Sequence, residues 1–312
     1  MKVVVSGGTG FIGRALCRSL VRHGIGVTAL SRNLLQAKTM LGPSIKVVEW
    51  DGVGLGPWEH ELDSATAIIN LAGESIAAGR WTQKRKQLIV DSRVKATRLL
   101  AQAISRHTNQ PRLLINASGI GYYGTNQEIW FDERNGTGSD FFADLCVAWE
   151  TAALTAHSAG VRVVCLRIGM VLEKNGGALA KMVPPFRAFV GGPIAPGTQW
   201  VSWIHRADLI GLIEWALTNE QVSGPVNAVA PGAVTMKEFC GTLGKILHRP
   251  SWLSVPAFAL RLAFGELTSF MTTGQRVIPK VAVDGGYQFR YPQLDSALRS
   301  IFMRAPASEV RS

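Results

Sequence analysis

A glycine-rich stretch near the start of the chain carries the strongest chemical signal. Residues 6–13 read SGGTGFIG, between an apolar run at 3–6 that predicts a strand and a helical pattern over 11–23. Glycine permits a tight turn and lets backbone N–H groups approach a pyrophosphate at the helix N-terminus. The pattern predicts a dinucleotide site, and the alternative is a glycine-rich turn without a ligand. Its predicted residues are Gly7, Thr9, Gly10, Phe11, Ile12 and Gly13.

The residues after the second predicted strand indicate which dinucleotide would bind. Arg32 follows Gly13 by 32 − 13 = 19 residues, and Ser31 precedes it. An acid at about this distance would favour NAD, whereas a basic residue accommodates the 2′-phosphate of NADP. The sequence therefore predicts NADP(H), with NAD less favoured. The alternative is an exposed arginine at a strand end.

Two further strand ends belong with this predicted site. Asp51 follows the third strand and could meet the adenine, while Asn70, Leu71, Ala72 and Gly73 end the fourth strand or follow it. Ligands of open α/β sheets lie at the carboxyl ends of the strands, and small residues allow close approach. Ordinary turn chemistry remains the alternative for both segments.

The elements that must position these residues alternate along the chain. Apolar runs without polar alternation are typical of parallel strands covered on both faces, so the sequence predicts an α/β fold. That fold is a Rossmann-type doubly wound parallel sheet with a smaller C-terminal substrate lobe. The predicted strands are 3–6, 26–30, 46–49, 67–71, 112–117, 162–168 and 225–229, and the predicted helices are 11–23, 141–158, 204–219, 235–247 and one basic helix after the fourth strand.

The change of pattern after residue 173 predicts the domain division. Residues 174–200 are rich in Gly and Pro, which predicts a loop or lid over a cleft. We expect an NAD(P)-binding domain at 1–173, completed by about 200–231. We expect the C-terminal lobe to comprise 174–199 and 232–312.

The basic residues of the chain are typical of a solvated protein surface. Its net charge is +11, and residues 80–112 contain nine basic residues and one acid. Apolar residues recur there at helical spacing, so the segment predicts an amphipathic helix with a solvated basic face. Because no aromatic platform or nucleic-acid motif accompanies the charge, no nucleic-acid partner is expected. The apolar runs are too short to predict a membrane span.

The cysteines predict neither a metal site nor disulfides. Cys17, Cys146, Cys165 and Cys240 are scattered without ligand-like spacing, so we expect reduced, buried thiols. A strand begins almost at residue 1, which leaves no room for a leader segment. These features favour a cytoplasmic protein, and they leave a homodimer open.

Later motifs resemble a known family. Ser118, Tyr123-Gly124, Leu166-Arg167 and Trp203–Asp208 follow the glycine motif in the order typical of extended short-chain dehydrogenases/reductases. More narrowly, the chain resembles the YfcH-like epimerase family, which carries a small C-terminal domain of unknown function. That resemblance rests on the segments 72–76, 80–81, 92–93, 121–124, 184–187, 191–194 and 274–279. The resemblance implies an NAD(P)-dependent epimerase or oxidoreductase with a small-molecule substrate.

The chain departs from the extended enzymes at their reactive helix. Those enzymes carry Tyr-x-x-x-Lys there, but the matching positions are Phe142 and Cys146. Neither residue can act as the acid/base or hold a ribose. Tyr123 and Ser118, just beyond the fifth strand, remain as candidate proton donors, and Ser118 also as a cofactor contact. A tyrosine without a lysine beside it is expected to keep a pKa near ~10, and the alternative is packing with a satisfied hydroxyl.

Three residues in the Gly/Pro-rich segment are the predicted substrate contacts. Lys181, Arg187 and Gln199 would face the cleft and favour an anionic substrate, with solvated loop charges as the alternative. His205 and Asp208 resemble a family motif, and the resemblance implies that they hold the first domain against the second lobe. Two hypotheses follow: an NADP-dependent epimerase or oxidoreductase with non-standard catalytic groups, or a non-catalytic NADP(H)-binding regulatory protein. A third hypothesis, the least favoured, is a protein that binds nucleic acid or a membrane surface.

Overall fold

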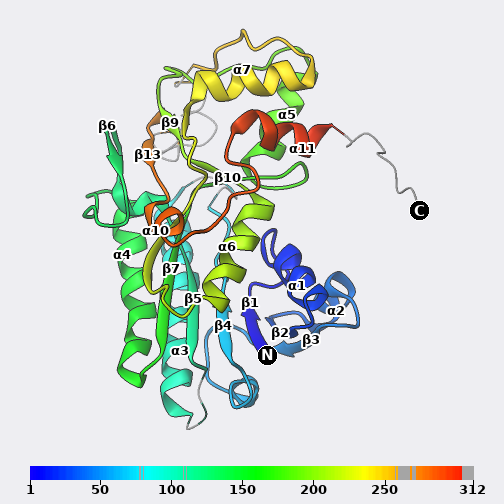
Figure 1. Cartoon of the computed structure of the whole chain (residues 1–312), viewed down its shortest axis with the longest axis vertical. Coiled ribbons are helices and arrows are strands. Elements are labelled where there is room, and N and C mark those ends of the chain that lie inside the picture. Colours follow the sequence, from blue (N-terminus) through cyan, green and yellow to red (C-terminus); the bar gives the residue numbers. More distant parts are fainter. Residues whose placement is uncertain are drawn as a thin grey trace.

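The computed structural model describes residues 1–303 except 77, 78, 80, 108, 110, 257, 259–267 and 269–271. A sheet of seven parallel strands forms the centre of the molecule (Figure 1). The strands are β1 (Lys2–Ser6), β2 (Gly26–Ser31), β3 (Lys46–Glu49), β4 (Ala67–Asn70), β5 (Leu113–Gly119), β7 (Arg162–Ile168) and β11 (Gly224–Ala228). Their order is β11-β7-β5-β4-β1-β2-β3. The predicted α/β fold with a doubly wound parallel sheet is confirmed.

The strand order reverses between β1 and β4. From β1 the chain first builds outward through β2 and β3, then crosses back to place β4 on the other side of β1. The loops that follow these two strands therefore leave the sheet in opposite directions and open a crevice at its carboxyl edge. Such a crevice is where open α/β sheets bind their ligands.

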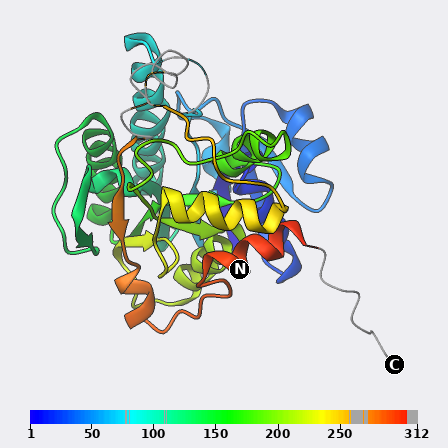
Figure 2. The same cartoon turned by 90° about the horizontal axis from the view of Figure 1, so that it is seen from above.

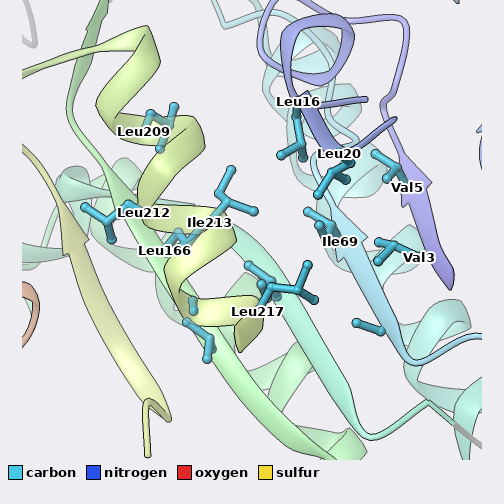
Figure 3. Close-up of a cluster of buried hydrophobic side chains, with 14 of the residues drawn as sticks. Val3, Val5, Leu16, Leu20, Ile69, Leu166, Leu209, Leu212, Ile213 and Leu217 are labelled. Atoms are coloured by element: carbon cyan, nitrogen blue, oxygen red, sulfur yellow. The ribbon is translucent and has the colours of Figure 1, made fainter. Parts of the chain in front are cut away.

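Strand side chains alternate between two cores, one on each face of the sheet. Val3 and Val5 pack against α1 (Gly13–Arg22) and α6 (Arg206–Thr218), whereas Val4 packs on the opposite face. Figure 3 shows leucines of both helices meeting Val3, Val5, Ile69 and Leu166. The opposite face is covered by α3 (Gln83–Arg106) and by α4 (Phe141–Leu154) with the turn η3 (Thr155–Ala159), and α2 (Leu34–Leu41) lies beside β3. This double cover explains why the central strands are mostly apolar on both faces.

The structure of α3 differs at one residue from the prediction that its basic side chains are solvated. Most of its basic residues are exposed as expected, but the side chain of Arg93 is buried. Arg80, part of the same basic segment, lies outside the described residues. Within the described part of the chain, no helix combines the length and apolar character that crossing a membrane requires.

A second group of helices lies beyond the carboxyl ends of the strands. In Figures 1 and 2, α7 (Met236–Leu247) and α11 (Leu294–Phe302) run side by side with α5 (Gly177–Arg187) nearby. Their apolar faces form a separate cluster around Trp203, Phe186 and Phe239. The exact domain boundaries stay a prediction. Shorter elements complete the chain: η1 (Pro57–Glu61), η2 (Ile120–Tyr123), β6 (Asn126–Phe131), β8 (Met170–Leu172), β9 (Trp200–Val201), β10 (Trp203–His205), β12 (Val234–Thr235), β13 (Gln275–Val277) and α10 (Lys280–Asp284).

The prediction of a loop at 174–200 was wrong in part, because α5 occupies its first half. Leu179, Val183 and Phe186 are buried on one face of this helix, and that i, i+4, i+7 spacing is an apolar helical stripe. Pro184 and Pro185 lie in the last turn, where the helix ends soon after them. The proline pair suggested irregular structure, but burial of the stripe stabilises the helix.

His205 and Asp208 join α6 to the C-terminal lobe, in line with the predicted structural role. The Asp208 carboxylate accepts the N–H groups of Arg290 at 2.7 Å and Tyr291 at 2.9 Å. Nδ1 of His205 accepts the N–H of Ala207 at 3.1 Å, which requires this nitrogen to be unprotonated. Burial lowers the pKa of His205 from 6.5 to about 4.

This histidine makes stability depend on pH. The folded pKa lies below the unfolded value, so the unfolded chain takes up a proton between pH 6.5 and 4 that the folded chain does not. We expect the free energy of unfolding to fall as pH drops through this window, and the fall to be smaller in His205→Gln. Urea titrations at pH 7.5 and 5 measure it, with the exposed His60→Gln as control. Equal pH dependence in wild type and His205→Gln would contradict the expectation.

Candidate functional site

The loop after β1 is packed too tightly to hold side chains at its glycines. Gly7 has φ +71°, and a Cβ there would lie 2.6 Å from the carbonyl carbon and oxygen of Leu71. A Cβ on Gly13 would lie 2.2 Å from the carbonyl oxygen of Gly7. The Gly10 N–H donates to that same oxygen at 2.9 Å. The loop therefore passes directly against the end of β4, in the crevice where the strand order reverses.

The helix α1 begins at this loop without a side-chain cap. Its N-cap residue is Ile12, no side chain bonds the first turn, and no acid lies there. An uncapped N-terminus leaves N–H groups and the positive end of the helix dipole for an anion. Thr9 lies in the same turn, and the ring of Phe11 packs against Gly176 at the start of α5. The loop thus fits a pyrophosphate and also contacts the C-terminal lobe.

Ser31 and Arg32 lie beside the start of the glycine loop. Ser6 of β1 pairs with Leu30 of β2, which puts the next two residues at the crevice. Arg32 is exposed, and the Ser31 hydroxyl lies 3.3 Å from both the N and O of Asn33. An exposed guanidinium at this place can reach a phosphate on the adenosine ribose.

The hydrogen bonds of Asp51 favour the interpretation that this residue has an ordinary role in a turn. Its carboxylate accepts the N–H groups of Val53 at 2.8 Å and Gly54 at 3.1 Å, and these bonds lower the pKa of the carboxyl. The contact with adenine stays a prediction.

Asn70 is a buried connector between strands. Its amide donates to Thr97 Oγ1 at 2.8 Å and Asn116 Oδ1 at 2.6 Å, and its oxygen accepts from Ser6 Oγ. The N–H of Ala72 also points to this oxygen, at 3.3 Å. The side chain of Asn70 thus fixes the backbone at 71–73 against the glycine loop, and those residues lie where we expect the cofactor.

A buried ion pair dominates the region beyond β5. Glu150 of α4 and Arg167 of β7 form two parallel bonds of 2.9 Å each. Ser118 donates to Glu150 Oε1 at 2.7 Å. Arg167 Nη1 donates to the Tyr123 hydroxyl at 3.0 Å, and that hydroxyl donates to Asn227 Oδ1 at 2.7 Å.

This network favours the alternative interpretation of Tyr123 and Ser118 as packed side chains with satisfied hydroxyls. Both side chains are buried, and both hydroxyl protons are engaged by internal acceptors. Burial raises the pKa of Tyr123 to about 12, above the ordinary value expected from the sequence, although Arg167 opposes the rise. The geometry favours structural hydroxyls over proton donors. The sequence analysis named Arg167 only as part of a family motif and did not single out Glu150 or Asn227, because only the fold brings these distant positions together.

The helix α4 carries no titratable group suited to acid/base chemistry at the two positions singled out by sequence. Phe142 packs against Trp81, with ring centroids 5.0 Å apart. The thiol of Cys146 lies 3.5 Å from the carbonyl oxygen of Gly119, and burial raises its pKa to about 11.

The three predicted substrate contacts do not converge. Lys181 and Arg187 are exposed on α5, and six helical positions separate them by about 120° around the axis. Gln199 is buried, and its amide accepts the Gly197 N–H at 2.8 Å and donates to the carbonyl of Ile194 at 3.1 Å. Gln199 therefore holds its own loop, which its sequence position did not reveal.

Arg93 is the residue near this site that sequence reasoning placed wrongly. It follows Ile89 by four residues and precedes Ala96 by three, so helical periodicity already put it on the buried face of α3. Its guanidinium lies against Gly73, where a Cβ would be 3.0 Å from Cζ.

The fold and the glycine loop together define a Rossmann-type dinucleotide-binding protein. The chain belongs to the NAD dependent epimerase/dehydratase family, whose model matches residues 3–229. A domain of unknown function, DUF1731, matches residues 255–301.

Relatives match nearly the whole chain. The chloroplastic homologue of epimerase family protein SDR39U1 from Arabidopsis thaliana is 40% identical, with 96% of this chain and 86% of that protein covered. Epimerase family protein YfhF of Bacillus subtilis is also 40% identical, with 96% and 98% covered. The crystal structure of human SDR39U1 with NADPH superposes with a TM-score of 0.87 at 36% identity, covering 96% and 99% of the two chains.

The buried ion pair should be costly to break. In Glu150→Gln, Arg167 would remain buried without a carboxylate, so we expect a loss of about 3–5 kcal/mol in the free energy of unfolding. Urea unfolding monitored by tryptophan fluorescence gives this value. The matched control is Asp295→Asn, which removes an exposed pair with Arg299 and should change little. The double variant Glu150→Gln/Arg167→Met should recover part of the loss, and an unaltered unfolding midpoint in Glu150→Gln would contradict this account.

Proposed function

We propose that the chain binds NADP(H) and acts as an epimerase- or oxidoreductase-like protein on a small substrate, through groups other than a Tyr-x-x-x-Lys pair. The observation that carries the proposal is the glycine loop packed against Leu71, with Arg32 exposed beside it. NADPH in the crystal structure of human SDR39U1, 36% identical to this chain, supports the choice of cofactor.

Residues along the carboxyl edge of the sheet would hold the adenosine and pyrophosphate parts of such a cofactor. Arg32 and Ser31 would hold the 2′-phosphate, and the glycine loop with the N-terminus of α1 would hold the pyrophosphate. The bound cofactor would supply or accept hydride. The backbone at 71–73 would line its path toward β5. The lobe built on α5, α7 and α11 would cover the substrate.

The charge of the substrate, the branch of the family, the oligomeric state and the cellular location are proposals. The substrate would be anionic if Lys181 or Arg187 contacts it. Placement in the YfcH-like branch, a homodimer and a cytoplasmic location stay predictions, and one relative is named chloroplastic.

A second function is favoured by one observation. Phe142 and Cys146 replace the reactive pair, and the hydroxyls nearest the site are bonded within the protein. A chain that binds NADP(H) without turnover, and reports its redox state to a partner, would have this arrangement. Tight NADPH binding with no oxidation of NADPH across a panel of nucleotide sugars and hydroxy acids would support it.

The cofactor choice depends on Arg32. A charge-assisted contact between arginine and phosphate contributes about 1.5–3 kcal/mol, so Arg32→Ala should weaken NADPH binding about tenfold to hundredfold. NADH, which lacks the phosphate, should bind equally to both forms. Titration calorimetry with each cofactor measures this, and Arg22→Ala at the far end of α1 is the control. Equal affinity of the wild type for NADPH and NADH would reject the proposal.

Any turnover should survive the loss of the Tyr123 hydroxyl. Because burial raises its pKa to about 12, the phenol stays protonated near neutrality, and its proton is already donated to Asn227. We expect Tyr123→Phe to keep kcat within about threefold and leave the pH–rate profile unshifted. A large fall in kcat together with a lost ionisation in that profile would instead make Tyr123 the acid/base.

A further inference from the structure

Two loops of the C-terminal lobe expose four large apolar side chains. Phe189 and Val190 follow α5 and are 55% and 46% exposed, and Trp252 and Leu253 follow α7 and are 67% and 42% exposed. The chain after α7 runs over the end of the lobe that lies away from the sheet, at the top of Figure 1. We call these four side chains the apolar loop surface.

Hydrogen bonds hold the two loops together. The N–H groups of Trp252 and Leu253 donate to the carbonyl of Gly191 at 3.2 and 3.3 Å, and the indole N–H of Trp252 donates to the carbonyl of Phe189 at 3.1 Å. A Cβ on Gly192 would lie 2.2 Å from the carbonyl oxygen of Leu253. The four apolar side chains therefore belong to one packed surface.

Phe189 occupies a backbone conformation that suits glycine. Its φ is +63°, and it follows Ala188, the residue that ends α5, with the N–H of Val190 donating to the carbonyl of Pro185 at 3.0 Å. Glycine is the usual residue at this position of a helix end, because a Cβ strains the left-handed backbone. The Arg249 guanidinium lies 4.5 Å from the centre of the Phe189 ring, but the residue stays more than half exposed. Packing alone does not account for a phenylalanine here.

The two segments that form this surface carry only positive charges. Residues 174–200 and 239–258 contain five lysines and arginines and no aspartate or glutamate. Arg187 is exposed, and Nε of Arg249 has no hydrogen-bond partner. Within the part of the chain that the structure describes, neither arginine forms an ion pair with a carboxylate. The apolar loop surface is therefore bordered by cations that an anionic partner could pair.

These charges argue against a second copy of the chain as the partner. A symmetric dimer through this surface would set Arg187 and Arg249 against their own counterparts, with no carboxylate of the two loops to pair them. Asp295 of the neighbouring helix α11 interacts with Lys245, but it is already paired with Arg299.

The combination of side chains favours a bilayer over a nucleic acid. Single-stranded nucleic acid would use the rings of Phe189 and Trp252 and the cations, but it offers nothing to the aliphatic Val190 and Leu253. A bilayer with anionic lipid matches both kinds of group. Aromatic and aliphatic side chains enter the boundary between headgroups and acyl chains, and cations are attracted by the negative headgroups.

We propose that the apolar loop surface docks the protein on membranes that contain anionic lipid. Phe189 and Trp252 enter the headgroup boundary, and Arg187 and Arg249 bind lipid phosphate groups. Docking of this kind needs no membrane-spanning helix. It uses neither the basic face of α3 nor the glycine loop, so it does not depend on the proposed function.

Co-sedimentation of the whole chain with vesicles tests the charged part of the proposal. The protein should sediment with vesicles of phosphatidylcholine and phosphatidylglycerol in equal parts, not with phosphatidylcholine alone, and added salt should release it. Each arginine near an anionic surface contributes about fivefold, so Arg187→Gln/Arg249→Gln should lower the partition coefficient about thirtyfold. The matched control Arg98→Gln/Arg106→Gln removes two exposed arginines of α3 and should change it less than about twofold.

Phe189→Gly tests the apolar part and separates docking from folding. Glycine relieves the left-handed backbone, so the unfolding temperature should stay the same or rise while the partition coefficient falls about tenfold. Trp252→Ser should lower the partition coefficient to a similar extent. Leu35→Ser on α2 removes an apolar side chain that is 82% exposed elsewhere and should leave vesicle binding unchanged.

Failure to sediment with either vesicle, or equal sedimentation with both, would overturn the proposal. So would loop variants that sediment like the wild type, or an α3 variant that loses as much binding as the loop variants. Binding to single-stranded DNA without binding to vesicles would assign the surface to nucleic acid instead. A wild-type dimer that Phe189→Gly dissociates, with no vesicle binding, would assign it to self-association.

Discussion

The buried pair of Glu150 and Arg167 is the interaction on which the region beyond the sheet depends. It joins α4 to β7. Glu150 accepts a hydrogen bond from the Ser118 hydroxyl, and Arg167 donates to Tyr123, which in turn donates to Asn227 on β11. Two charges removed from water are stable only when every donor and acceptor around them is matched. The polar groups that a reaction could have used are consequently committed to holding the strands together.

Two buried arginines near the candidate site have different surroundings. Arg167 of β7 is paired with a carboxylate, whereas the contacts of Arg93 within the described residues are a carbonyl and an indole ring. The chain keeps the glycine loop of a dinucleotide-binding family but has Phe142 and Cys146 at the positions of the Tyr-x-x-x-Lys pair.

Much of the fold and the glycine loop could be predicted, because the sequence patterns that indicate them are local. Seven apolar runs and one glycine triplet were enough to predict the parallel sheet, since the central strands are buried on both faces. Gly7 and Gly13 are each required by a close contact within their own loop or with the end of β4. The helix at 177–187 was not predicted, because its two prolines suggested irregular structure. Its three apolar residues are buried in the cluster that also contains residues of α7 and α11.

Residue types and their spacing were enough to predict the sheet, the glycine loop, the basic residue after β2 and the absence of the reactive pair at 142 and 146. Which polar groups are available depends on the folded arrangement. The sequence left Tyr123, Ser118 and Gln199 open as reactive or structural, because a residue type does not specify its partner. Asn227 lies 104 positions from Tyr123, whereas Gln199 bonds within its own loop. Arg93 read as a solvated charge, and the fold buries it. The physical reason is that a hydrogen bond or a desolvated charge is defined by the groups around it in space, which residue types and spacing do not specify.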